Sequence, residues 1–168
     1  KVPEVTIVSG LAYGIDVIAH KAAMESGIST IIIPAHGLDR IYPSVHRSVA
    51  IQALDKGGIL TEYTRETEPE RFSFVARNRI VAGMADAVVV VESKKKGGSL
   101  ITADMAVDYG RDVFAVPGRV DDICSAGCND LIKRNKAQLI DYADDLIAAM
   151  QWQEQSTEAI QTCLVEMM

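Results

Sequence analysis

Four consecutive valines, Val88–Val91, lie near the middle of the chain within the strand candidate Ala87–Glu92. A strand that alternates apolar and polar residues keeps one face in water, whereas a strand that is apolar throughout belongs in a parallel sheet covered on both faces. The runs Val5–Val8 and Val113–Val116 have the same character. The chain is therefore expected to build a parallel sheet with helices on both sides.

Helical segments alternate with the strand candidates along the chain. The expected strands are Val5–Val8, Ser29–Ile33, Ile59–Tyr63, Ala87–Glu92, Val113–Val116 and Gln138–Ile140. The expected helices are Ile15–Ser26, Val45–Lys56, Phe72–Met84, Ser99–Tyr109, Asn129–Asn135 and Ala143–Trp152. This rhythm predicts an α/β fold, a Rossmann-like doubly wound and mainly parallel sheet with helices on both faces. We assign residues 1–152 to this domain and residues 153–168 to a weakly patterned C-terminal tail.

Length and composition narrow the remaining possibilities. At 168 residues the chain is the size of one domain, and its apolar runs are far too short to span a bilayer. It begins at Lys1 and has no signal-peptide pattern, so we expect a cytoplasmic fragment of a longer protein with no membrane partner. Cys124 and Cys128 lack a second pair of ligands, so we expect neither a disulfide framework nor a metal site.

Charge is distributed unevenly. The net charge of −6 argues against indiscriminate nucleic-acid binding. Residues 71–99, however, carry six basic and two acidic side chains, whereas the segments on either side are acidic. The basic side chains are those of Arg71, Arg77, Arg79, Lys94, Lys95 and Lys96. A short cationic segment in an acidic chain predicts a local site for an anionic ligand.

The start of this segment predicts a helix with two different faces. One face is an apolar stripe that recurs every four positions and is expected to meet the core: Phe72, Ala76, Ile80 and Met84. Arg71, Phe74 and Asn78 share another, exposed face, with Arg77 beside it. An aromatic ring among guanidinium groups suits a base that stacks while its phosphate meets a cation. Taken alone, the run favours a plainer interpretation, in which Phe74 packs against a neighbouring element and the arginines are solvated.

Glycines and small polar residues follow the predicted strands, at the edge where an open parallel sheet binds ligands. Gly97, Gly98 and Ser99 open a helix directly after three lysines, and the free N–H groups of a helix start attract phosphate. The alternative interpretation is an ordinary helix N-cap that follows a solvated turn and binds no ligand. Because three lysines are adjacent, the phosphate-binding interpretation is favoured. Ser9 and Gly10 follow the first strand at the same edge.

Enzyme chemistry finds little support in the sequence. Ser9–Gly14 matches neither the dinucleotide fingerprint nor a P-loop, and Pro34–His36 stands where a ribose-binding carboxylate would be expected. Asp16 and His20 are one helical turn apart, which allows a catalytic pair but favours an intrahelical contact or a cap. We therefore predict no catalytic residue and no cofactor, and we assign no role to the other histidines.

Several stretches of the sequence together resemble the DprA/Smf family, the bacterial DNA-processing protein A. Each stretch is weak alone, but they occur in the family's order and cover most of the chain. They are Ser9–Asp16 with Ala19-His20, Gly37–Asp39 with Tyr42-Pro43, Phe74–Gly83, Gly98–Ala103, Gly110–Gly118 and Ser125–Ile132. The chain is identified by them as a member of this family.

The resemblance implies a protein that is not an enzyme and that binds single-stranded DNA through an extended Rossmann domain. Members of the family form homodimers, protect incoming single strands during natural transformation and help to load the RecA recombinase onto them. The resemblance therefore implies single-stranded DNA, RecA and a second copy of the chain as partners. It places the dimer surface around Leu131–Ile140.

The resemblance also implies a nucleic-acid site. Phe74 would stack on a base, with Arg71 on the same exposed face and the remaining groups holding phosphate or backbone. Arg79 is expected alongside them, and because it projects nearer the core side, bracing of the sheet is the alternative role. Asp16 is expected to be architectural. The full set of expected nucleic-acid-binding residues is Ser9, Gly10, Arg71, Phe74, Arg77, Asn78, Arg79, Lys96, Gly98 and Ser99.

The chain also departs from the family pattern. The family has an earlier strand that ends in a Gly-Ser/Thr-Arg segment, and this strand would precede Lys1, so the fold is expected to be truncated. We expect its loss to leave an unpaired strand edge and to weaken DNA binding or disturb dimerisation. A lysine triplet like Lys94–Lys96 fits an anionic groove but is not part of the pattern.

Two other functions remain as alternatives. One is an enzyme of the phosphoribohydrolase-like class acting on nucleoside monophosphates, which uses a Pro-Gly-Gly-x-Gly-Thr turn. Here Pro117-Gly118 continues as Arg119-Val120, which departs from that turn. The other is a nucleotide-sensing or scaffolding domain, which predicts no preference for longer strands.

Overall fold

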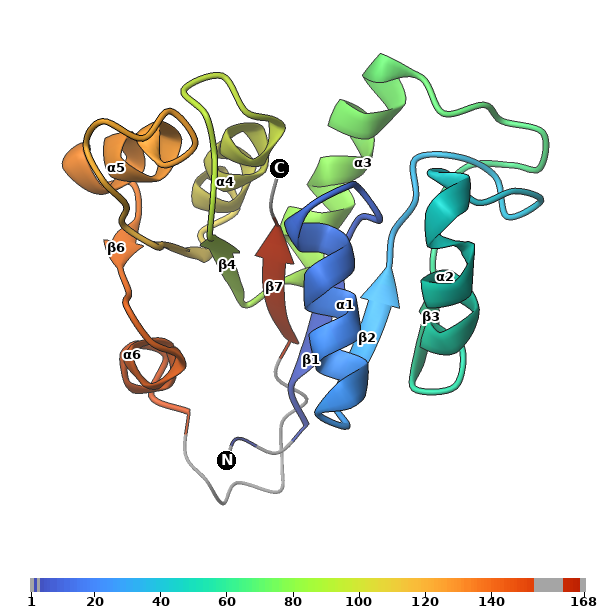
Figure 1. Ribbon diagram of the computed structural model, residues 1–168, viewed down its shortest axis with the longest axis horizontal. Coiled ribbons are helices and arrows are strands. Elements are labelled where there is room, and N and C mark those ends of the chain that lie inside the picture. Colours follow the sequence, from blue (N-terminus) through green and yellow to red (C-terminus); the bar gives the residue numbers. More distant parts are fainter. Residues whose placement is uncertain (1, 3, 153–161, 167–168) are drawn as a thin grey trace.

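The computed structural model describes residues 2, 4–152 and 162–166 and contains one seven-stranded sheet (Figure 1). Every pair of neighbouring strands is parallel, so the expected parallel α/β sheet is confirmed. In spatial order the strands are β3 (Gly57–Ile59), β2 (Ser29–Ile32), β1 (Thr6–Ser9), β7 (Thr162–Glu166), β4 (Ala87–Val90), β5 (Asp112–Ala115) and β6 (Gln138–Leu139).

Helices cover both faces of this sheet, as expected for a doubly wound fold. One face packs against α1 (Ile15–Glu25), α2 (Arg47–Ala53) and α6 (Ala143–Ala149). The opposite face packs against α3 (Arg71–Met84), α4 (Gly98–Asp108) and α5 (Ala126–Lys133). Figure 1 shows α1 in front of β1 and β7, with α3 passing behind them.

The valine run explains why the sheet needs both layers. In β4, Val88 and Val90 pack on the side of α3, α4 and α5, whereas Ala87 and Val89 pack on the side of α6. All four side chains are buried. A strand with both faces in the core contributes apolar burial at every residue, which is why its sequence does not alternate.

Several predicted boundaries differ from the structure: α5 begins at Ala126, three residues before its predicted start, and α6 ends at Ala149, three residues before its predicted end. The third strand was expected at Ile59–Tyr63, but β3 covers Gly57–Ile59. Gly57 is pressed against β2, because a Cβ there would lie 1.8 Å from the Thr30 carbonyl oxygen, so the pairing begins at a residue without a side chain. The helix expected from Val45 to Lys56 begins as a short 3-10 turn, Ser44–His46, and α2 ends at Ala53.

The C-terminal tail contains a strand that the sequence analysis did not predict. β7 lies between β1 and β4 and pairs with both. The expectation of an unpaired edge is therefore wrong in this structure, because β1 has β2 on one side and β7 on the other. Residues 153–161 and 167–168 of the predicted tail lie outside the described residues, and the division at residue 152 stays a prediction.

Within the described part of the chain, no helix is long and apolar enough to cross a membrane.

Candidate functional site

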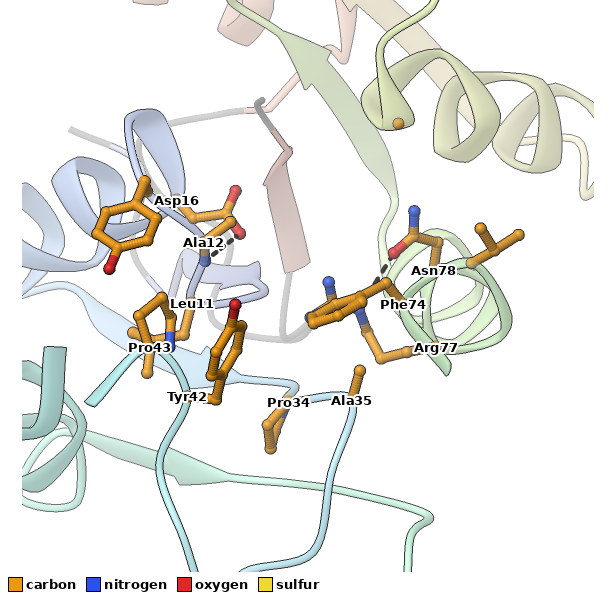
Figure 2. A pocket seen from close by; sticks show the side chains of 13 residues that line it. Leu11, Ala12, Asp16, Pro34, Ala35, Tyr42, Pro43, Phe74, Arg77 and Asn78 are labelled. Atoms are coloured by element: carbon orange, nitrogen blue, oxygen red, sulfur yellow. Dashed lines mark hydrogen bonds between the residues drawn. The ribbon is translucent and has the colours of Figure 1, made fainter. Parts of the chain in front are cut away.

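A cavity of about 230 Å³ lies where β1 and β2 end and where α1, α3 and α4 approach one another (Figure 2). Its position is the edge at which open parallel sheets bind ligands. Most of its surface is apolar, with a few polar groups between. It is lined by Leu11, Ala12, Tyr13, Asp16, Pro34, Ala35, Tyr42, Pro43, Phe74, Val75, Arg77, Asn78 and Gly98.

Two aromatic rings form one wall of the cavity. The Phe74 ring, on the first turns of α3, lies 6.1 Å from the Tyr42 ring between centroids, and the planes are inclined by 49°. Figure 2 shows both rings directed into the same space. Tyr13 stands at the rim, where its exposed ring meets His46 edge-on at 5.0 Å. Such rings offer apolar faces to a planar ligand.

The expected orientation of α3 is wrong. Its buried residues are Arg77, Asn78, Val81 and Ala82. Phe72 was expected to face the core but is 84% exposed, whereas Ile80 and Met84 of the same stripe do pack against the core. The first turns of α3 lie beside the loops at the strand ends rather than over the sheet, so the inward side there meets polar loop backbone. Phe74 consequently faces the cavity and Tyr42, instead of standing on an exposed face beside Arg71.

Arg77 forms the floor of the cavity and is almost fully buried. Its Nη1 donates to the Ile33 carbonyl oxygen at the end of β2, and its Nε donates to Asn78 Oδ1 at 3.1 Å. No carboxylate among the described residues forms an ion pair with it. Its Nη2 has no hydrogen-bond partner among the described residues, and a buried guanidinium with a free donor favours an electron-rich ligand.

Gly10 separates Arg77 from Asp16. A Cβ built on Gly10 would lie 2.5 Å from Arg77 Nη1 and 2.6 Å from Asp16 Oδ2. Asp16 is buried at the start of α1, and its Oδ2 accepts the Ala12 backbone N–H at 3.0 Å. Gly10 therefore has no side chain because the two charged groups occupy the space where one would stand.

His20 holds the Gly10 loop in place from behind. Its Nε2 donates to the Gly10 carbonyl oxygen at 2.7 Å, and its Nδ1 lies 2.6 Å from Thr30 Oγ1. Burial lowers the pKa of His20 below its usual value of 6.5, so the ring is neutral at pH 7. The Thr30 hydroxyl donates to the Ile7 carbonyl oxygen at 3.1 Å. His20 and Asp16 are not hydrogen-bonded to each other, and a catalytic pair is not formed.

Two further histidines orient the remaining loops of the cavity. His36 Nδ1 donates to the Gly37 carbonyl oxygen at 2.9 Å, which leaves Nε2 to accept the Tyr42 backbone N–H at 3.1 Å. His46 Nδ1 donates to the Leu11 carbonyl oxygen at 2.8 Å. The sequence analysis assigned these histidines no role, because their partners are backbone groups that no sequence pattern identifies.

The other predicted site residues fall into two groups. Gly98 lines the cavity, whereas Ser9, Gly10 and Ser99 are buried and do not line it. The Ser99 hydroxyl does not cap α4, whose N-cap residue is Gly97. Arg71 and Lys96 are exposed and do not line the cavity.

Arg79 was expected to project nearer the core side, with bracing of the sheet as its alternative role, and this orientation is wrong. Its side chain is half exposed and forms an ion pair with Glu62.

Lys96 lies in a separate cleft between α4 and α5, with Lys95, Arg134 and Lys136. The cavity thus gathers Phe74, Arg77, Asn78 and Gly98 of the predicted set, and adds Asp16, Tyr42 and Tyr13, whose only signal was their place in the motif stretches.

The part of the chain that the structure describes contains no cluster of side chains suited to bind a metal ion. No group of three or more His, Cys, Asp or Glu residues is placed there to hold an ion. Cys128 is buried and Cys124 half-buried, and both are free thiols. Burial raises the pKa of the Cys128 thiol, which disfavours the reactive thiolate.

Comparison with known proteins agrees with this geometry. The profile of the DNA recombination-mediator protein A family matches residues 1–151. The chain is 42% identical over 149 residues to DNA processing protein DprA of Streptococcus pneumoniae, covering 89% of this chain and 52% of that protein. It is 40% identical over 149 residues to protein Smf of Escherichia coli, covering 88% of this chain and 40% of that protein. The chain thus spans about half or less of the length of these relatives.

Two solved structures share the fold. The crystal structure of DprA from Streptococcus pneumoniae superposes with a TM-score of 0.79 at 43% identity, covering 85% of this chain and 50% of that one. DNA processing protein A from Helicobacter pylori superposes with a TM-score of 0.76 at 35% identity, covering 87% of this chain and 66% of that one. The Helicobacter protein is described for its single-stranded DNA binding mode.

Proposed function

The chain belongs to the DNA recombination-mediator protein A family, and from this membership and the geometry of the cavity we propose that it binds single-stranded DNA. The observation that carries the proposal is the meeting of the Phe74 and Tyr42 rings with the buried Arg77 guanidinium in one cavity. Stacking on aromatic rings together with contacts from cations is the usual way in which proteins hold single strands. The bases of a duplex are stacked inside the helix and cannot enter such a cavity.

The basic residues outside the cavity extend this proposal. Arg71 is exposed at the start of α3, and Lys94–Lys96 are exposed in the loop that precedes α4. Exposed cations of this kind hold the phosphates of a strand whose base occupies the cavity. Their contribution is electrostatic and does not depend on base identity.

We extend the proposal to the partners and setting that the family implies. The chain would act without catalysis, in the cytoplasm, protecting single strands that enter during natural transformation and assisting the loading of RecA. A homodimer would form through the edge of the sheet beyond β5, where β6 exposes both Gln138 and Leu139. An exposed edge strand pairs readily with a second chain. Analytical ultracentrifugation over a range of concentrations tests this part.

Fluorescence anisotropy with a labelled oligo-dT tests the central proposal. Unlabelled single strands are expected to compete with the label, and duplex of the same length is expected to compete poorly. Equal competition by duplex would contradict the proposal. If no strand binds and the chain releases a base from a nucleoside monophosphate, the phosphoribohydrolase alternative is correct instead.

A further inference from the structure

The cleft between α4 and α5 lies on the other side of α4 from the cavity. Its volume is about 410 Å³, and both helices and the loop before α4 line it. Figure 1 shows α4 between α3, which bounds the cavity, and α5, which bounds the cleft. Gly98 lines the cavity and its neighbour Gly97 lines the cleft. The start of α4 is therefore the ridge between the two.

The two carboxylates that line the cleft already have partners within it. Asp104 Oδ1 lies 2.6 Å from Lys136 Nζ, and Asp130 Oδ2 lies 2.8 Å from Arg134 Nε. Each ion pair joins one acidic and one basic side chain, so the two pairs together add no net charge to the cleft.

Three lysines at the cleft have no such partner. Lys95 and Lys96 line it, and Lys133 lies beside it in a smaller hollow that is also lined by Lys95. All three side chains are exposed, and none of them forms an ion pair with another described residue. Uncompensated positive charge is therefore gathered at one cleft of a chain whose net charge is −6, which favours an anionic ligand there.

The loop that carries two of these lysines is held between the starts of α4 and α5. Gly127 of α5 donates its N–H to the Ser93 carbonyl oxygen at 2.7 Å, and a Cβ on Gly127 would lie 2.7 Å from the Lys94 carbonyl oxygen. Gly97 donates its N–H to that same Lys94 oxygen at 3.0 Å. Because the loop backbone is fixed in this way, binding a ligand through its lysines costs less ordering of the chain.

We propose, building on the single-strand binding proposed above, that a strand leaving the cavity crosses the start of α4 and continues along the cleft between α4 and α5. Lys95, Lys96 and Lys133 would hold the phosphates of this second section of the strand. Gly97 and Gly98 form the crossing, where the absence of side chains lets a phosphodiester chain approach the backbone closely.

The walls of the cleft match a sugar–phosphate chain better than a free phosphate ion. Leu100 and Ile101 of α4 and Leu131 of α5 give it apolar surface between the lysines. In a nucleic-acid strand, sugar rings alternate with charged phosphates, so a strand uses both the apolar surface and the cations. A free phosphate ion would use the cations alone.

The double variant Lys95→Gln with Lys133→Gln tests this path with a labelled oligo-dT of about 16 nucleotides. Losing two phosphate contacts should make the slope of log affinity against log salt concentration shallower by about 1.4, at about 0.7 for each contact. The same slope corresponds to about 25-fold weaker binding at 0.1 M salt, with the difference vanishing towards 1 M. Replacing both lysines by arginine keeps the charges and should keep the affinity within about twofold.

The matched control is Lys21→Gln with Lys56→Gln. It removes the same charge from two exposed lysines, one on α1 and one shortly after α2, and these helices pack on the opposite face of the sheet. The control should keep the salt slope of the wild type. Circular dichroism should show the same fold for all variants, because every replaced side chain is exposed.

Oligomer length separates the cleft from the cavity. An oligo-dT of about four nucleotides, measured by competition with the labelled strand, fills the cavity without extending along the cleft, so the loss caused by Lys95→Gln with Lys133→Gln should shrink. An equal loss at both lengths, or a double variant that matches the control on the long strand, would overturn the path and leave single-strand binding intact. Failure of the wild type to bind the long strand would overturn both.

Discussion

Gly10→Ala is the smallest change that tests how the cavity is held together. A methyl group on Gly10 would lie 2.5 Å from Arg77 Nη1, 2.8 Å from its Nη2 and 2.6 Å from Asp16 Oδ2. The ends of long side chains can usually yield to such a group. Here both ends are buried and hydrogen-bonded, Arg77 to Ile33 and Asn78 and Asp16 to Ala12, so yielding breaks bonds.

The expected cost combines two effects. Overpacking a tight site costs about 1–3 kcal/mol, and losing a hydrogen bond to a charged group costs about 1.5–3 kcal/mol. If a side chain moves away from the methyl group, the steric clash is relieved while a hydrogen bond is lost, so the two costs do not add in full. We therefore expect Gly10→Ala to lower the free energy of unfolding by about 2–4 kcal/mol. The backbone at Gly10 is not in the left-handed region, so the loss would be steric alone.

Urea unfolding followed by circular dichroism measures this cost, with Gly58→Ala as the control. Gly58, in β3, has nothing within 4 Å of its Cβ position and no positive φ, so its replacement should leave stability unchanged or raise it slightly. If the two variants unfold at the same urea concentration, Gly10 is not confined by Arg77 and Asp16, and the description of the cavity floor is wrong.

Three further predictions concern the ligand and pH. Phe74→Ala should weaken single-strand binding by about 1–3 kcal/mol in anisotropy titrations, while Phe72→Ala, on the exposed side of the same helix, should change it little; equal losses would remove Phe74 from the site. The logarithm of the affinity should fall linearly with the logarithm of salt concentration, with a slope near −0.7 for each phosphate neutralised, and a flat response would exclude a role for the exposed lysines. Because folding lowers the pKa of His20, the unfolded chain binds more protons than the folded chain below pH 6.5, so the free energy of unfolding should fall as the pH drops from 6.5 towards the folded pKa. In urea titrations at several pH values, His20→Gln should reduce the slope of the free energy of unfolding against pH. An identical slope in the variant would contradict a buried neutral imidazole.

The sequence predicted the sheet well because burial on both faces leaves a direct mark on composition. Val88–Val90 could not be mistaken for a half-exposed strand, and β1, β2, β4 and β5 fall within two residues of their predicted ends. The faces of α3 were not predictable in the same way. Its first turns project beyond the sheet, so the side of Phe74 and Arg77 is determined by loops from β1 and β2 rather than by apolar periodicity.

The strand β7 was missed for a different reason. Thr162–Glu166 is a short segment that follows a stretch without pattern, and nothing local shows that it pairs with β1 and β4. Its neighbours are distant in sequence, and such pairing is decided by which strand edges remain open after the rest of the sheet has formed. Predictions from local pattern do not contain that information.

The order of the strands explains why the cavity has its particular chemistry. From β7 the chain order runs outward in both directions, through β1, β2 and β3 on one side and β4, β5 and β6 on the other. Helices α1 and α3 lie on opposite faces of the sheet at this point of reversal. Asp16 from α1 and Arg77 from α3 therefore approach the end of β1 from opposite faces and meet at Gly10. Neither helix alone places a carboxylate and a guanidinium on either side of Gly10, so this charged part of the cavity floor is a product of the topology.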